Sequence, residues 1–199
     1  GLVEALKVAL IKDTKFFELI ASRADALNAF DPETVEAVIK GSAELHMNHI
    51  ASAGDPFELG SSRPLDFGHW SAHKLEQVTN FQLSHAEAVS VGVALDVIYS
   101  RRTGLLETTT AERILNIMDS LNYPTWHDSL DENCPVTSEP RVFDGLDEFR
   151  EHLGGHLTVM MLTDIGQGVD IHEIDRQVMA ESISELKMRD AKRATVEVS

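Results

Sequence analysis

The stretch Asp66-Phe-Gly-His-Trp-Ser-Ala-His73 and its continuation Leu83-Ser-His-Ala-Glu87 together hold three of the nine histidines in the chain. His69 and His73 are four residues apart, so on a helix they lie on one face, about one turn from each other. Two successive helical elements that carry these imidazoles could converge on a divalent metal such as zinc, cobalt or iron.

The third histidine of the stretch, His85, follows Ser84, which has the side-chain chemistry of an N-cap, so a new helix is predicted to begin there. An alternative interpretation keeps all three histidines as ordinary surface or helix-end residues. A zinc-protease site is not predicted, because Trp70 stands where that pattern requires a glutamate after the first histidine.

Composition favours one domain of 199 residues with a proper core, since 43% of the residues are hydrophobic. The net charge of −16, from 33 acids and 17 bases, argues against a nucleic-acid partner. No apolar run is long enough for a transmembrane helix and no signal-peptide pattern is present, so we expect no membrane partner. Cys134 is the single cysteine, which excludes an intrachain disulfide and fits a reducing, cytoplasmic location.

Hydrophobic periodicity predicts a mainly α-helical fold with one small β-hairpin. Apolar residues on nearly all sides of the segment 85–103 predict a central helix. The other helices are expected over 1–12, 15–28, 32–51, 110–121, 144–153 and 174–189. The hairpin is expected from strands 157–162 and 169–174 around a turn at Gly166-Gln-Gly168. The tail 191–199 is expected to be frayed, and 122–144 to be an irregular loop.

Three blocks resemble the signature motifs of 3-dehydroquinate synthase and its sugar phosphate cyclase relatives: Gly1-Leu-Val-Glu-Ala-Leu-Lys7, Asp66 to His73, and Leu83 to Glu87. The family reads roughly Gly-Leu-Ala-Glu-x-x-Lys, Asn-Phe-Gly-His-x-x-Gly-His and Leu-x-His-Gly-Glu. The resemblance covers residues 1–120 well and the remainder more weakly. It implies a two-domain enzyme with an N-terminal NAD-binding domain and a helical, metal-binding C-terminal domain.

The whole range 1–199 is expected to be that C-terminal domain alone, a fragment without the NAD-binding half, since the chain starts at Gly1 and opens directly into a helical pattern. The fragment alone is then expected to be inactive. A homodimer is compatible with this interpretation.

Carried over by motif, the resemblance implies that Glu4, His69 and His85 bind the metal, zinc or cobalt. One carboxylate and two imidazoles with open positions form a catalytic rather than a closed structural site. The same resemblance places His73 near the substrate phosphate and pairs Lys7 with anionic groups of the substrate.

The implied chemistry is that of a carbon–oxygen lyase which cyclises a phosphorylated keto sugar. NAD transiently oxidises a hydroxyl, the neighbouring C–H becomes acidic, and phosphate leaves by elimination. The hydride returns, the ring opens, and an intramolecular aldol reaction closes the carbocycle. NAD is regenerated, so it acts as a cofactor together with the metal.

The chain departs from the family pattern where Asp66 replaces Asn, and where Ala72 and Ala86 replace Gly. Asp66 is kept as a catalytic candidate. The late segment with two lysines is also missing, and Arg150 and His152 stand in its region. Together with Arg63 they are the candidates for binding substrate or phosphate.

A divergent cyclase acting on seven-carbon sugar phosphates is therefore preferred over 3-dehydroquinate synthase proper of the shikimate pathway, which must also bind a substrate carboxylate. Two hypotheses outside this pair stay open. One is a metal-dependent alcohol dehydrogenase-like domain, against which the Leu-x-His-x-Glu block argues. The second is a non-catalytic helical interaction domain whose histidines are relics.

Overall fold

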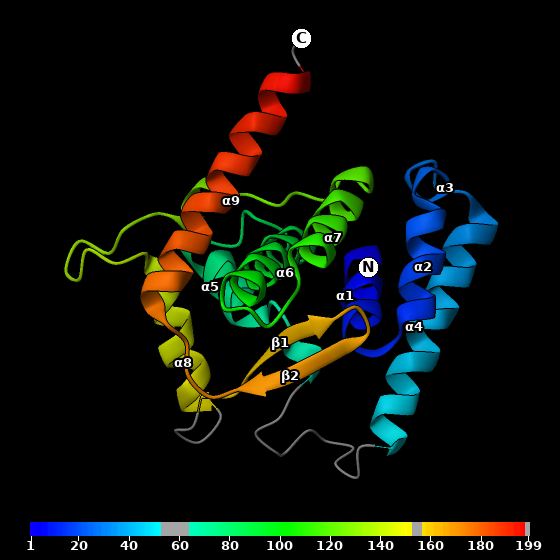
Figure 1. The fold of residues 1–199 in the computed structure, drawn as a ribbon, viewed down its shortest axis with the longest axis horizontal. Helices are drawn as coiled ribbons and strands as arrows, with labels where there is room; N and C mark the ends of the chain where they lie inside the picture. Colours follow the sequence, from blue (N-terminus) through cyan, green and yellow to red (C-terminus); the bar gives the residue numbers. More distant parts are fainter. Residues whose placement is uncertain (53–63, 153–156, 198–199) are drawn as a thin grey trace.

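The computed structural model describes residues 1–52, 64–152 and 157–197 (Figure 1). Its helices in chain order are α1 Leu2–Lys12, α2 Thr14–Ser22, α3 Ala24–Asn28, α4 Pro32–Ser52, α5 His69–Val78, α6 His85–Arg102, α7 Thr108–Ser120, α8 Asp144–His152 and α9 Arg176–Glu197. Short 3₁₀ turns are η1 Pro64–Asp66, η2 Asp128–Leu130 and η3 Arg141–Phe143. Strands β1 Val159–Asp164 and β2 Gln167–Ile171 form an antiparallel pair. The predicted mainly α fold with a hairpin is confirmed.

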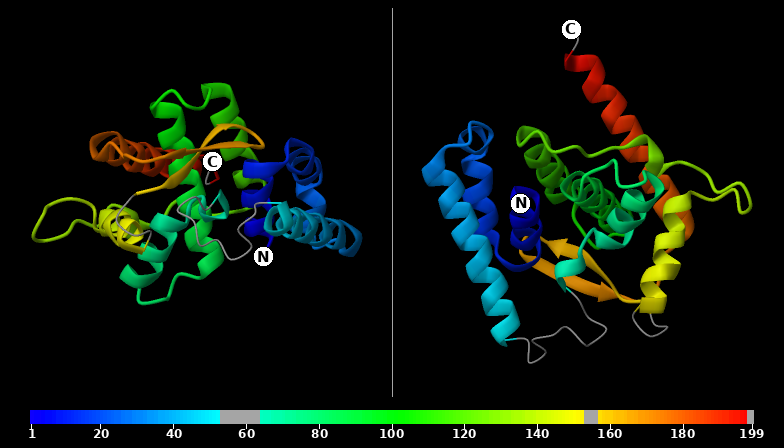
Figure 2. Two further views of the ribbon diagram at one scale, coloured as in Figure 1. Left: turned by 90° about the horizontal axis from the view of Figure 1, so that it is seen from below. Right: turned by 180° about the vertical axis from the view of Figure 1, so that it is seen from behind.

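Helix α6 is the centre of the molecule, because each of its residues from Ala88 to Ser100 is buried. Helices α1, α5, α7 and α9 and strand β1 all pack against it. Both views of Figure 2 place the blue α1–α4 group on one side of α6 and the yellow and orange α8 and α9 on the other. The central helix expected from apolar residues on every side is therefore confirmed.

Small residues let α5 begin in direct contact with the backbone of α6. A Cβ atom on Gly92 would lie only 2.1 Å from the carbonyl oxygen of Gly68. Gly68 itself precedes α5 with a φ of +77°, a left-handed conformation that glycine adopts at little steric cost. These two glycines fix where the first turn of α5 lies on α6.

The β-hairpin covers the core with the first strand, whose residues Val159 to Leu162 are buried. Its register pairs Val159 with Ile171 and Met161 with Val169. The second strand was expected over 169–174, but it spans 167–171.

The tip of the hairpin packs on the junction between α1 and α2. The turn is Ile165-Gly166, not Gly166-Gln-Gly168 as expected, because Gly166 has a φ of +81° while the next residue already pairs in the sheet. The Gly166 amide donates to the Leu10 carbonyl at 2.7 Å, and the Thr14 hydroxyl donates to the Ile165 carbonyl at 2.7 Å.

Side-chain caps begin two of the helices that the sequence predicted. The Asp13 carboxylate accepts from the Phe16 amide at 2.9 Å at the start of α2, and the Asp31 carboxylate accepts from the Thr34 amide at 2.9 Å at the start of α4. The predicted helix 15–28 is wrong in one respect. Arg23 leaves helical geometry, with φ −117° and ψ 21°, and divides the segment into α2 and α3.

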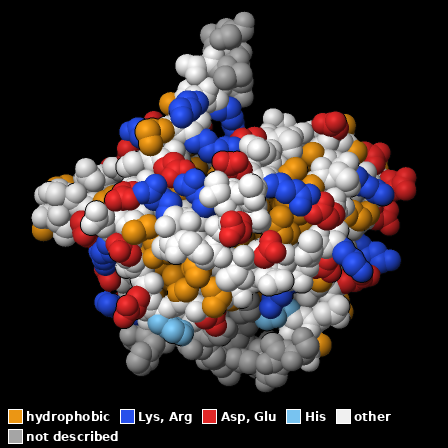
Figure 3. All heavy atoms as spheres, viewed as in Figure 1, with side chains coloured by type: hydrophobic (Ala, Val, Ile, Leu, Met, Phe, Trp, Pro, Cys, Tyr) orange, Lys and Arg blue, Asp and Glu red, His pale blue; other side chains and the backbone are white. Residues whose placement is uncertain are grey.

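Helix α9 is longer than expected, since it continues to Glu197 through most of the tail predicted to be frayed. Arg189 and Arg193 both pair with Asp119 of α7, which holds these late turns in place. Near the middle of α9, Glu185 pairs with Arg101 of α6. Figure 3 shows basic and acidic side chains intermixed over this face. No helix in the three described ranges is long and apolar enough to span a bilayer.

Candidate metal centre

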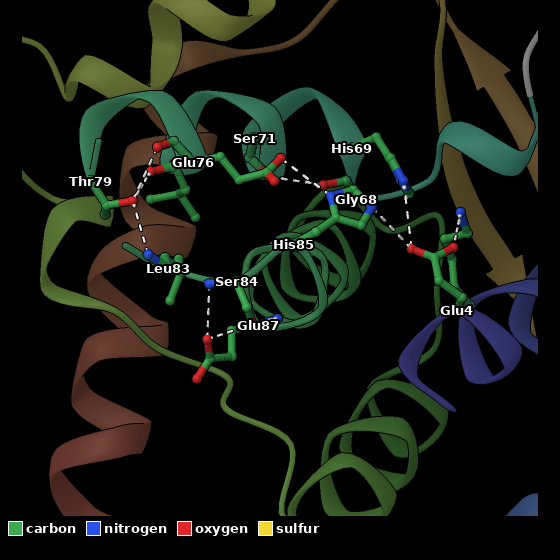
Figure 4. Close-up of polar contacts among 12 residues, drawn as sticks. Glu4, Gly68, His69, Ser71, Glu76, Thr79, Leu83, Ser84, His85 and Glu87 are labelled. Carbon is green, nitrogen blue, oxygen red and sulfur yellow. Dashed lines mark hydrogen bonds and ion pairs between the residues drawn. The ribbon is translucent and has the colours of Figure 1, made fainter. Parts of the chain in front are cut away.

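Three helix starts bring one carboxylate and two imidazoles together, as Figure 4 shows. Glu4 lies in the first turn of α1, His69 is the first residue of α5, and His85 is the first residue of α6. The Glu4 Oε1 atom lies 3.7 Å from Nε2 of His69 and 3.5 Å from Nε2 of His85. The structure thus gathers the three residues that the family resemblance assigned to the metal.

This arrangement fits a tetrahedral divalent metal. Metal–ligand bonds of about 2.1 Å at tetrahedral angles would separate ligand atoms by about 3.4 Å, close to the distances found. Glu4 Oε1 is buried and has no hydrogen-bond partner. A buried, unpaired carboxylate oxygen is unfavourable unless a cation or a donor satisfies it. Its position between two ring nitrogens supplies the chemistry that zinc or cobalt prefers.

Both histidines present the same nitrogen, Nε2, because their other nitrogen is already engaged. Nδ1 of His69 lies 3.2 Å from the carbonyl oxygen of Phe67, and Nδ1 of His85 lies 3.2 Å from Oε2 of Glu76. A carbonyl or carboxylate oxygen can only accept, so each neutral ring carries its proton on Nδ1 and a lone pair on Nε2. This is the tautomer that a metal ligand needs.

Burial keeps His69 in the neutral, ligand-competent form. Its pKa is lowered from 6.5 to about 4, chiefly by burial and then by the positive charge of Lys7, although the Phe67 carbonyl and Glu4 act in the opposite direction. His69 is therefore uncharged at neutral pH without any metal.

Lys7 lies against Glu4, with Nζ 2.7 Å from Oε2, and its side chain is only 5% exposed. Burial by itself would raise the pKa of the Glu4 carboxyl, but Lys7, with smaller help from His69 and His85, lowers it below the ordinary value. One Glu4 oxygen thus faces the ammonium and the other faces the imidazoles. The role predicted for Lys7 toward the substrate stays a prediction.

His73 joins the group from one turn further along α5. Its ring centroid lies 5.3 Å from that of His69 and 6.0 Å from that of His85, and it is exposed. His73, Glu76 and His85 also offer ligand atoms within 4.8 Å of one another. His73 is therefore placed beside the three-residue group, where it can reach a ligand bound there.

The other predicted site residues lie in more varied places. Asp66 ends η1 and is half-buried, three residues before His69. Arg150 lies on α8 and pairs with Asp147 of the same helix at 3.4 Å. His152 ends α8, but its side chain is not described, and Arg63 lies outside the described residues. Their predicted contacts with substrate or phosphate stay predictions.

Two residues that the sequence did not reveal contact a histidine or the residues next to one. Glu76 is seven residues after His69 and three after His73, a helical spacing that could have revealed it. Asp96 is the acid among the buried residues Ala88 to Ser100 of α6, and an acid in a run of buried residues is itself a signal.

Comparisons with known proteins point to one enzyme family. The family model described as 3-dehydroquinate synthase C-terminal matches residues 1–138. A 2-epi-valiolone synthase of Actinosynnema mirum is 28% identical over 192 residues, covering 96% of this chain and 47% of its own length. This chain spans about half the length of the relatives that it matches.

Two solved structures have a similar fold. ValA, a 2-epi-5-epi-valiolone synthase from Streptomyces hygroscopicus with NAD⁺ and Zn²⁺ bound, matches with a TM-score of 0.83 and 25% identity over 95% of this chain and 51% of its own. A 2-deoxy-scyllo-inosose synthase complexed with carbaglucose-6-phosphate, NAD⁺ and Co²⁺ matches with a TM-score of 0.68 over 93% of this chain and 51% of its own. The second is only 18% identical and therefore indicates a shared fold alone.

Proposed function

Because the chain belongs to the 3-dehydroquinate synthase C-terminal family, we propose that it is the metal- and substrate-binding part of a sugar phosphate cyclase. The reaction is the conversion of a phosphorylated keto sugar to a carbocycle with loss of phosphate. The observation that carries this proposal is the unpaired, buried Oε1 of Glu4 between the Nε2 atoms of His69 and His85.

Each residue of this centre has a separate role in the proposed reaction. Glu4, His69 and His85 hold the metal, which supplies Lewis-acid polarisation of substrate oxygens when bound. Lys7 keeps Glu4 anionic and holds its second oxygen. His73, exposed beside both imidazole ligands, donates a hydrogen bond to the substrate phosphate and can move a proton there. NAD, a hydride carrier, would bind mainly to the N-terminal half that such relatives carry.

The preferred substrate is a seven-carbon keto sugar phosphate without a carboxylate. Support comes from the likeness to valiolone synthases and from Lys7, which is occupied by Glu4 and so is not an unpaired cation for a substrate carboxylate. The alternative is 3-dehydroquinate synthase proper, whose substrate carries a carboxylate. Phosphate release from one or the other substrate, measured in the longer protein, distinguishes the two. The 199-residue chain alone is expected to release none.

The first test is a Co²⁺ titration of the metal-stripped chain, followed by its visible d–d bands. We expect about one equivalent to bind with the intense bands of a low-coordinate site. His69→Ala, His85→Ala and the nearly isosteric Glu4→Gln should each abolish or strongly weaken this binding. His127→Ala is the matched control, because His127 caps the short turn η2 and lies outside the group. Failure of the unaltered chain to bind Co²⁺, or binding that all three variants retain, would contradict the proposal.

A further inference from the structure

Asp96 is a carboxylate in the middle of the most buried helix, and its side chain has no exposed surface. Burial of an acid carries a large desolvation penalty, and burial raises the pKa of Asp96 from 3.8 to about 7 even though Trp70 and Gly68 act against the shift. Among the described residues, no lysine or arginine forms an ion pair with Asp96 that would offset this penalty. The acid in this core therefore requires an explanation other than an ion pair.

The two oxygens of Asp96 each accept one hydrogen bond from a residue next to His69. Oδ2 accepts from the backbone amide of Gly68 at 3.0 Å, and Oδ1 accepts from Nε1 of the Trp70 indole at 2.9 Å. Gly68 precedes His69 and Trp70 follows it. The carboxylate therefore holds the chain on both sides of this histidine.

The first turn of α5 depends on this contact. Gly68 is the N-cap residue of α5 and offers no side-chain cap, so one of the amides that helix starts leave unpaired is satisfied by Asp96 of the neighbouring helix. Gly92, one turn before Asp96 on the same face of α6, leaves room for the Gly68 carbonyl. Gly68 is thus held on α6 at two points. Its amide donates to Asp96, and its carbonyl lies in the space that Gly92 leaves open.

We propose that Asp96 is a positioning residue for the metal centre, which fixes His69 by holding Gly68 and Trp70. This inference rests on the proposed function, because it assigns the role of Asp96 to metal binding at His69. The ring of His69 is oriented by the Phe67 carbonyl. That carbonyl keeps its place only while the 67–70 backbone stays seated on α6. Displacement of this segment would move Nε2 of His69 away from Oε1 of Glu4.

The test compares two indole–carboxylate pairs in the same chain. Asp96→Asn replaces one acceptor oxygen by an NH₂ group, which would face the N–H donor of Gly68 or Trp70. Trp70→Phe removes the indole donor and keeps an aromatic ring. The matched controls are Asp128→Asn and Trp126→Phe, because Trp126 Nε1 donates to Asp128 at 3.0 Å on the exposed surface. The readouts are Co²⁺ affinity, the Co²⁺ d–d spectrum and the thermal unfolding midpoint of the metal-free chain.

We expect Asp96→Asn to weaken Co²⁺ binding about 10- to 100-fold and to change the d–d spectrum, as loss of a residue that orients a ligand does. Trp70→Phe should weaken binding less, and the double variant should not show the sum of both effects, since both substitutions disturb the hydrogen bond between Asp96 and Trp70. The surface pair should leave affinity and spectrum unchanged.

Variants of Asp96 and Trp70 that lower only the unfolding midpoint, with unaltered Co²⁺ affinity and spectrum, would overturn the inference and leave Asp96 a structural residue. If Asp96→Asn does not fold, Trp70→Phe alone decides between these outcomes. Absence of Co²⁺ binding in the unaltered chain would instead overturn the proposed function. The two failures are therefore distinguishable.

Discussion

The two imidazoles of the candidate metal centre are oriented in different ways. His69 is buried, with its side chain 11% exposed, and its Nδ1 faces a backbone carbonyl. His85 is half-exposed, at 48%, and its Nδ1 faces the carboxylate of Glu76. The first depends on where the backbone of α5 lies on α6, whereas the second depends on one side chain.

This difference teaches that a single site can be sensitive to two unrelated kinds of substitution. Changes in helix packing, even at glycines far from any ligand atom, should act through His69. Changes of one acid, with no effect on packing, should act through His85. The following three predictions separate these routes.

The largest effect is expected from Gly92→Ala. Its new methyl group would lie 2.1 Å from the Gly68 carbonyl, so α5 must move off α6. Overpacking against backbone should lower the free energy of unfolding by about 3 kcal/mol. Co²⁺ binding should be lost through His69. Urea unfolding and the cobalt titration measure both effects.

Gly104→Ala is the control for this substitution, because nothing lies within 4 Å of its added Cβ, although its φ is +76°. It should lower stability by about 1 kcal/mol through backbone strain, with no loss of cobalt binding. Equal effects of the two substitutions on cobalt binding would show that contact between α5 and α6 does not govern His69.

A smaller effect, confined to the metal, is expected from Glu76→Gln. The neutral amide holds the His85 proton less strongly and can flip to present a donor, so Co²⁺ affinity should fall about 10-fold or more. Glu87→Gln is the control, because Glu87 completes the capping box with Ser84 at the start of α6 and belongs to neither group of candidate ligands.

Glu87→Gln should change stability slightly and leave affinity unchanged. Binding of a second equivalent of Co²⁺ that disappears in Glu76→Gln would make Glu76 a ligand rather than an orienting acid. That outcome would show that His73, Glu76 and His85 form a metal site of their own.

The last prediction concerns pH and Asp96, the buried acid that accepts from Gly68 and Trp70. Because the pKa of Asp96 is raised from 3.8 to about 7 in the folded chain, the unfolded chain loses this proton at lower pH. The contribution of Asp96 to folding stability should therefore be greatest below about pH 4 and fall as pH rises toward 7, with a slope no steeper than about 1.4 kcal/mol per pH unit.

The stability difference between the unaltered chain and Asp96→Asn isolates this effect. His69 acts in the opposite sense, since its lowered pKa removes stability as pH falls from 6.5 toward 4, but both chains share it. Urea unfolding of the metal-free proteins at several pH values provides the data. A difference that does not change with pH would mean that Asp96 does not titrate in this range.

Local sequence signals predicted the parts of the fold that local chemistry determines. Ser84 began α6 through a capping box, and the apolar interior of α6 marked it as the central helix. The helix spacing of His69 and His73 and the helix start at His85 also indicated the imidazole half of the centre.

The remainder depended on contacts between distant segments. Glu4 resembles an ordinary helix acid by itself, and only the family resemblance singled it out, because its partners are residues from two other helices. The late turns of α9 were predicted to be frayed because their stabilising partner, Asp119, lies on α7. The break at Arg23 likewise has no local glycine or proline to signal it.

The attachment of the hairpin tip to α1 has a consequence for the order of assembly during synthesis. The hydrogen bond between Thr14 and Ile165 joins residues 151 positions apart. A ribosome that adds about 5–20 residues per second needs roughly 8–30 s to make that interval. Helix α4 can cover α1 early, but the hairpin that holds the far end of α1 arrives late. The helix that carries Glu4 is therefore fixed in its final place only near the end of translation of this segment, after His69 and His85 have been made.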